Sequence, residues 1–150
     1  MSYTCLLYHI VFRTKYSIPA IPFDHAEKLY AYIWGIVKNK KSILYRIGGM
    51  PDHIHMLIDL HPSIALSDFM HDTKLAISRF MNQNKNLFPD FQGWGDRYAA
   101  FSYGQDKKET IIRYIMNQQE HHKTVSFADE FRAFIENNGG VINEKYFLKD

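Results

Sequence analysis

Two apolar segments of strand character, residues 42–49 (SILYRIGG) and 53–60 (HIHMLIDL), are separated by only three residues, Met50-Pro51-Asp52. A connection this short joins two strands as an antiparallel hairpin, because parallel strands need a crossover of a dozen or more residues. The sequence therefore predicts an antiparallel sheet, and the other elements of the chain have to pack on it.

The remaining segments alternate between strand and helix character. Strands are predicted where β-branched and aromatic residues cluster, and helices where apolar residues recur at three- and four-residue steps. The predicted strands are 3–13 and 98–103. The predicted helices are about 25–39, about 62–82, about 107–122 and about 126–138. Residues 84–97 are predicted to form a loop, and residues 141–150 a tail that could extend along a neighbour or a partner. This order predicts an α+β fold in which helices pack on an antiparallel sheet, in a ferredoxin-like arrangement. No linker divides the chain, so residues 1–150 are expected to form one domain.

Composition excludes several classes of protein. With 150 residues, 46% of them hydrophobic, the chain is long enough to bury a core without disulfides or structural metals. Cys5 is the only cysteine, which excludes an internal disulfide and a CxxC metal or redox site and favours a reducing, cytoplasmic location. No apolar run approaches the roughly 20 residues that a membrane span needs, and the first residues do not resemble a secretory signal, so no membrane association is expected.

The net charge of +2 is unevenly distributed along the chain. Residues 1–50 carry seven basic and two acidic side chains, whereas each later third carries a small excess of acids. An anionic partner such as nucleic acid would be met mainly by the N-terminal third. The alternative is that the lysines near residue 40 only keep a helix end soluble.

His53 and His55 flank Ile54 on a predicted strand. Side chains alternate along a strand, so both imidazoles project from one face while Ile54 projects from the other. Two adjacent histidines on a rigid sheet make half of a divalent-metal site. The alternative is a pair of hydrogen-bonded histidines without a metal. Asp59, on the same face, is a candidate hydrogen-bond partner for His55, and Asp52 is expected to shape the turn.

Tyr114 and Gln118 are four residues apart on a predicted helix and therefore lie on one face of it. A tyrosine can act as a covalent nucleophile once it is activated, and a glutamine can offer its carbonyl oxygen to a hard metal such as Mg²⁺. The alternative is that Tyr114 packs beside neighbouring isoleucines and that Gln118 is solvated.

Together these motifs resemble one family, the single-tyrosine HUH transposases of minimal insertion sequences, in which HUH means His-hydrophobe-His. The similarity is carried by four segments in the same order, LLYHIVFRTKY, GGMPDHIHMLIDL, GWGDRYAAFSYG and RYIMNQQEHHKTVSFADEF. The resemblance implies an HUH-type palm in which His53 and His55 are metal ligands, Gln118 is the third protein ligand and Tyr114 is the nucleophile.

The resemblance also implies an activity. A member of this family is a metal-dependent DNA transesterase that cleaves and rejoins single-stranded DNA through a 5′-phosphotyrosine, at hairpins that flank a mobile element. Mg²⁺ or Mn²⁺ is the expected cofactor, and a homodimer is the expected assembly, with Tyr114 and Gln118 facing the histidines of either the same or the partner subunit. Six basic residues are candidates for phosphate contacts: Arg13, Lys15, Lys38, Lys40, Lys41 and Arg46.

Two alternatives to a transposase stay open from the sequence. One is a domesticated hairpin-DNA-binding protein that keeps the fold and no longer mobilises an element. The other is a metal-dependent hydrolase in which Tyr114 is only structural, and this alternative predicts turnover without the tyrosine hydroxyl.

Overall fold

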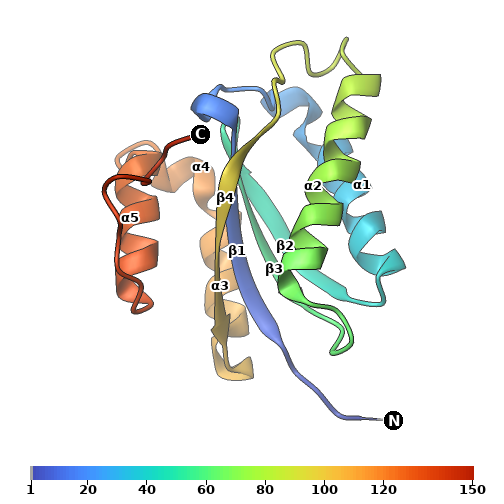
Figure 1. Ribbon diagram of the computed structural model, residues 1–150, viewed down its shortest axis with the longest axis vertical. Coiled ribbons are helices and arrows are strands. Elements are labelled where there is room, and N and C mark those ends of the chain that lie inside the picture. Colours follow the sequence, from blue (N-terminus) through green and yellow to red (C-terminus); the bar gives the residue numbers. More distant parts are fainter. Residues whose placement is uncertain (1) are drawn as a thin grey trace.

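The computed structural model describes residues 2–150 and consists of one antiparallel sheet with helices on both of its faces (Figure 1). The four strands lie in the order β2-β3-β1-β4. Their bounds are β1 Leu7–Thr14, β2 Ile43–Met50, β3 His53–Asp59 and β4 Trp94–Tyr103. The helices are α1 Phe23–Asn39, α2 Leu66–Gln83, α3 Lys108–Met116, α4 Gln118–His121 and α5 Phe127–Asn137, with short 3-10 turns at Lys15–Ser17 and Gln105–Lys107. The predicted α+β class and the predicted hairpin of β2 and β3 are confirmed.

The alternation of side chains along the central strands divides the core into two parts. Ile54, Met56 and Ile58 of β3 belong to the main core with α1 and α2. Leu57, which points the other way, packs in a smaller cluster against Ile111 and Ile115 of α3. In Figure 1 the sheet stands between α1 and α2 on one side and α3, α4 and α5 on the other. His53 and His55 have the same parity as Leu57, so they face the α3–α5 side.

The structure differs from the predicted elements at several places, and three of these differences have a clear physical reason. β4 begins at Trp94 because this residue pairs with Thr14 across a bulge, a pairing that the glycines around it concealed. The predicted helix 107–122 is broken at Asn117, which separates α3 from α4. The tail folds back on its own chain, where the Asp150 carboxylate accepts a hydrogen bond from the backbone N–H of Tyr16.

Across residues 2–150, none of the helices combines the length and the apolar character that crossing a membrane would require.

Gly49 allows the close approach of β2 to the strand that carries the histidines. A Cβ atom at this position would clash with the backbone carbonyl oxygen of His53, whereas a Cβ at Gly35 of α1 would meet no atom within 4 Å. We expect Gly49→Ala to lower the free energy of unfolding by about 1–3 kcal/mol through overpacking. Gly35→Ala is the matched control and should raise it by about 0.5–1 kcal/mol, because alanine is the better helix former. Urea denaturation of the two variants checks both signs.

Candidate active site

β3 places the rings of His53 and His55 side by side, and both are almost completely buried. Each ring is held through its Nδ1 atom, His53 by the Asp52 carboxylate at 2.7 Å and His55 by Nε2 of His9 at 2.9 Å. The Nε2 atoms of both histidines therefore point toward the helices. Asp52 lies in the turn as expected, and in addition it supports His53 directly.

The expected hydrogen bond between Asp59 and His55 is wrong. Asp59 instead accepts a hydrogen bond from the backbone N–H of Leu6 at 3.1 Å, and the Nδ1 position of His55 is taken by His9. His9 lies on the neighbouring strand β1, in a register that only strand pairing defines. For this reason the role of His9 could not be predicted from the sequence alone.

The break between α3 and α4 brings Tyr114 and Gln118 to the histidine pair. Gln118 is buried and lies with its Oε1 atom 2.9 Å from Nε2 of His53. The ring centroid of Tyr114 lies 5.7 Å from that of His55. A single chain thus brings together the four residues singled out in the sequence, in an arrangement in which the tyrosine and the histidines belong to the same subunit.

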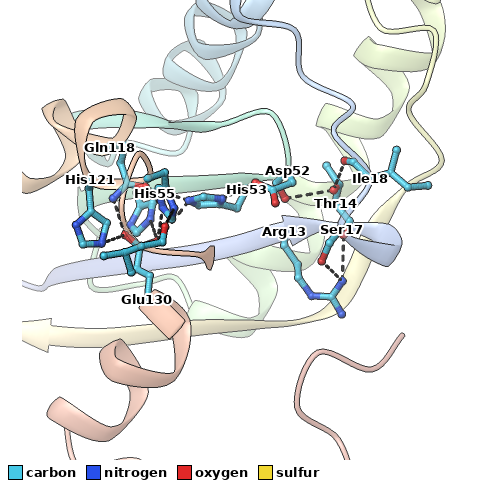
Figure 2. A network of polar contacts seen from close by, with 12 residues as sticks. Arg13, Thr14, Ser17, Ile18, Asp52, His53, His55, Gln118, His121 and Glu130 are labelled. Carbon is cyan, nitrogen blue, oxygen red and sulfur yellow. Dashed lines mark hydrogen bonds and ion pairs between the residues drawn. The ribbon is translucent and has the colours of Figure 1, made fainter. Parts of the chain in front are cut away.

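A fifth group, the carboxylate of Glu130 on α5, lies at the centre of this cluster (Figure 2). Its Oε1 atom is 3.1 Å from Nε2 of His55, 3.4 Å from Nε2 of His53 and 3.0 Å from Nε2 of His122. Its Oε2 atom accepts hydrogen bonds from the Tyr114 hydroxyl and from the amide of Gln118.

Glu130 is not among the site residues predicted from the sequence. The available signal is its place among Phe127, Phe131 and Phe134, which follow one another at three- and four-residue steps on α5. A carboxylate within an apolar helical stripe is unusual, because burying an unpaired charge is costly. The partners that compensate it come from β3, α3 and α4, and their proximity is a result of tertiary structure.

Burial and hydrogen bonding shift the pKa values of the cluster in opposite directions. Burial lowers the pKa of His53, but hydrogen bonds to the carboxylates of Asp52 and Glu130 outweigh it and raise that pKa to about 9. Burial lowers the pKa of His55 to about 4. Burial opposes ionisation of Glu130, yet hydrogen bonds from His53 and His55 hold its pKa well below the usual range. Burial and the Glu130 carboxylate both raise the pKa of Tyr114, so its hydroxyl stays protonated.

The donor set of the cluster fits a divalent cation. Asp52 uses the Nδ1–H of His53, and Glu130 uses the amide N–H of Gln118. Nε2 of His53, Oε1 of Gln118 and Oε1 of Glu130 therefore converge, with a proton on Nε2 of His53 as long as no cation is bound. Such atoms repel one another unless a proton or a cation lies among them. The ligand atoms of His53, His55 and Glu130 lie within 4.8 Å of one another. With separations of 2.9–3.4 Å between them, His53, His55, Gln118 and Glu130 would be able to hold one small divalent cation together.

The raised pKa of His53 predicts that the free energy of unfolding depends on pH, which can be measured in the presence of a chelator. Because the folded-state pKa of about 9 exceeds the unfolded value of 6.5, the stabilisation is complete below pH 6.5 and is lost as the pH rises to 9. The free energy of unfolding should fall by at most about 1.4 kcal/mol per pH unit in this range. His55, with its pKa near 4, acts in the opposite sense and lowers stability as the pH falls from 6.5 to 4. Urea unfolding between pH 5 and pH 9 should show a maximum near pH 6.5, and His53→Gln should flatten the alkaline side.

The six basic residues proposed for phosphate contacts do not form one patch. Arg13 is buried, and its guanidinium makes two hydrogen bonds to the Asp150 carboxylate at 2.9 and 3.1 Å, which leaves it no free edge for a phosphate. Figure 2 shows Arg13 apart from the histidine cluster. The other five are partly or fully exposed: Lys15, Lys38, Lys40, Lys41 and Arg46.

Three of these residues, Lys38, Lys40 and Lys41, lie at the C-terminal end of α1. This helix packs on the face of the sheet opposite to His53 and His55. Lys40 also forms an ion pair with Asp72 of α2 at 3.2 Å. The structure therefore separates these lysines from the histidine cluster by the thickness of the sheet.

A strand with His-hydrophobe-His beside a helix that carries a tyrosine defines the class of single-tyrosine HUH proteins. Comparison with protein families agrees, since residues 2–118 match the family described as transposase IS200 like. The chain belongs to this IS200-like transposase family. The match ends at Gln118, so α5 and Glu130 lie outside it.

The chain is also similar to individual transposases and to their solved structures. The ISDra2 transposase TnpA of Deinococcus radiodurans is 25% identical over 119 residues, which cover 77% of this chain and 85% of that protein. The crystal structure of a putative transposase from Deinococcus radiodurans is similar with a TM-score of 0.61 and 26% identity, over 78% of this chain and 93% of that chain. A REP-associated tyrosine transposase bound to a REP hairpin has the same fold, with a TM-score of 0.62 and 11% identity over 100% of this chain and 95% of that chain.

Proposed function

We propose that this protein is a transposase that cleaves and rejoins single-stranded DNA at hairpin-flanked element ends through a 5′-phosphotyrosine. The observation that carries the proposal is the meeting of the Tyr114 hydroxyl with His53, His55 and Gln118 in one buried cluster. The cofactor is Mg²⁺ or Mn²⁺, and its protein ligands include the two histidines and the carbonyl oxygen of Gln118. The protein acts in the cytoplasm as a homodimer.

The residues divide the chemistry between them. His53, His55 and Gln118 hold the cation, which when bound polarises the scissile phosphate and neutralises developing charge. The Tyr114 hydroxyl oxygen forms a bond to phosphorus as the bond from phosphorus to the 3′ oxygen breaks, and a 3′-hydroxyl is released. The phosphodiester energy stays in the phosphotyrosine, so a later attack by a 3′-hydroxyl restores the DNA strand without ATP. The absence of a GxxxxGK[ST] motif from the sequence agrees with this chemistry.

A groove beside Tyr114 supports access for a DNA strand. This cavity of about 520 Å³ is lined by Tyr114, Glu130 and His121, with Lys107 and Tyr103 farther along it. A lysine can contact a phosphate and an aromatic ring can stack on an unpaired base, with a contribution of about 1–3 kcal/mol for each stacked base. The hairpin in the solved structure of the REP-associated tyrosine transposase supports hairpin DNA as the kind of substrate.

The experiment that tests this function uses labelled single-stranded oligonucleotides that carry the hairpins found on either side of the gene. Incubation with Mn²⁺ should give a protein–DNA adduct that survives a denaturing gel and disappears after protease treatment. Omission of the metal, or addition of EDTA, should abolish the adduct. If hairpins are bound and no adduct forms with any flanking sequence, the protein is a DNA-binding member of the family and the proposed transposition chemistry is wrong.

A further inference from the structure

We infer that Glu130 is a further protein ligand of the cation and that the same carboxylate holds the hydroxyl of Tyr114, so that cation binding and the position of the nucleophile are coupled. The inference rests on the proposed function and extends it to a residue of α5, a helix beyond the residues that match the transposase family.

The Oε1 atom of Glu130 lies where the Nε2 atoms of His53 and His55 point. It lies 3.1 Å from Nε2 of His55 and 3.4 Å from Nε2 of His53, the two nitrogens that Asp52 and His9 aim toward the helices. A carboxylate oxygen is the ligand that Mg²⁺ and Mn²⁺ prefer, more than an imidazole nitrogen. Two histidines and one amide would leave a hard cation with no charged protein ligand, and Glu130 supplies that charge.

The Oε2 atom of Glu130 faces the nucleophile. It accepts hydrogen bonds from the Tyr114 hydroxyl and, at 2.7 Å, from the Gln118 amide. The amide bond also orients Gln118 so that its carbonyl oxygen points to His53. The Glu130 carboxylate therefore orients both Gln118 and Tyr114. Glu130 is in this sense a positioning residue for Tyr114.

The burial of Glu130 supports this role. Its side chain is 3% exposed, and within residues 2–150 its ion-pair partners are all histidines. A buried carboxylate needs compensation of several kcal/mol, which a permanently charged Lys or Arg usually provides. Histidines provide it only when they are protonated or when they share a cation with the carboxylate. The same set of side chains, one carboxylate among the imidazoles of His53, His55, His121 and His122, offers the nitrogen and oxygen ligands that a divalent cation accepts.

The first test is the affinity for Mn²⁺, measured by calorimetry on the whole protein without DNA. Glu130→Gln keeps the shape of the side chain and removes its charge, and it should weaken Mn²⁺ binding by about tenfold or more. Glu136→Gln, an exposed position on the same helix, is the matched control and should leave the affinity unchanged. Glu130→Asp, which keeps the charge, serves as a second variant and should bind Mn²⁺ more tightly than Glu130→Gln.

The second test follows Tyr114 directly. In protein labelled with 3-fluorotyrosine, the ¹⁹F resonance that is missing from Tyr114→Phe belongs to Tyr114. Addition of Mg²⁺ should shift this resonance in the wild-type protein and leave it in place in Glu130→Gln. A purely structural role for Glu130 would not produce this difference.

The outcomes separate the inference from the proposed function. Unchanged Mn²⁺ affinity in Glu130→Gln overturns the inference, even if the wild-type protein forms the DNA adduct. Tighter Mn²⁺ binding in Glu130→Gln also overturns it, because the carboxylate would then compete with the ion for the histidines. If the wild-type protein forms no adduct but Glu130→Gln weakens Mn²⁺ binding and abolishes the ¹⁹F shift, the proposed function fails and the assignment of Glu130 stands.

Discussion

Tyr114→Phe should abolish the covalent protein–DNA adduct and leave the binding of hairpin DNA near its wild-type level. The substitution removes the only atom that is proposed to attack phosphorus, and loss of a nucleophile typically costs on the order of a thousandfold or more in rate. The phenyl ring keeps its packing beside His9 and His55. Loss of the hydrogen bond to the buried Glu130 carboxylate should cost about 1.5–3 kcal/mol of stability. This is less than the total stability of a typical domain, so the variant should stay folded.

Tyr103→Phe is the control for this experiment, because Tyr103 lines the same groove and its hydroxyl donates to Asn138, away from the histidines. This variant should form the adduct at the wild-type rate. A denaturing gel reports the adduct, and a gel-shift assay without Mn²⁺ reports binding. Strand cleavage that persists in Tyr114→Phe would favour the metal-dependent hydrolase, in which water replaces the tyrosine as the attacking group.

The parts of the fold that depend on local pattern could be predicted from the sequence. The short connection at 50–52 requires an antiparallel pair, and the structure contains it as β2 and β3. The start of β4 could not be predicted, because Trp94 joins the sheet through its pairing with Thr14 and lies between two glycines. The break at Asn117 is likewise concealed in the sequence, because the helical period continues across it while the chain bends.

The residues of the candidate site also fall into two groups, those that local pattern predicts and those that only the tertiary structure brings in. Strand alternation alone places His53 and His55 on one face, and helical spacing alone places Tyr114 and Gln118 on another. That the two faces meet is a property of the tertiary structure. Glu130 and His9 come from elements whose place beside His53 and His55 depends on tertiary structure, which is why the sequence indicated the two histidines, Tyr114 and Gln118 but not Glu130 or His9.

His53→Ala and His55→Ala, made separately, should each weaken Mn²⁺ binding by on the order of 100-fold or more and reduce the adduct to background at millimolar metal. Removal of residues that only support a ligand already costs about 10–100-fold in metal affinity, so loss of a ligand should cost at least as much. Each substitution also leaves a partner without its hydrogen bond, Asp52 in one variant and His9 in the other. Circular dichroism and hairpin binding should therefore be measured alongside the Mn²⁺ affinity.

His71→Ala is the matched control, because His71 is exposed on α2, across the sheet from the cluster, and its loss should change neither Mn²⁺ affinity nor adduct formation. If either buried histidine can be replaced in a folded protein without loss of Mn²⁺ affinity, the pair on β3 is structural and the cation has to bind elsewhere. If both variants lose the ion but still bind hairpins, metal binding and DNA recognition are separate properties of the protein. We expect both variants to bind hairpins, since neither substitution removes the side chains of Tyr103, Lys107 and Tyr114 that line the groove proposed for DNA.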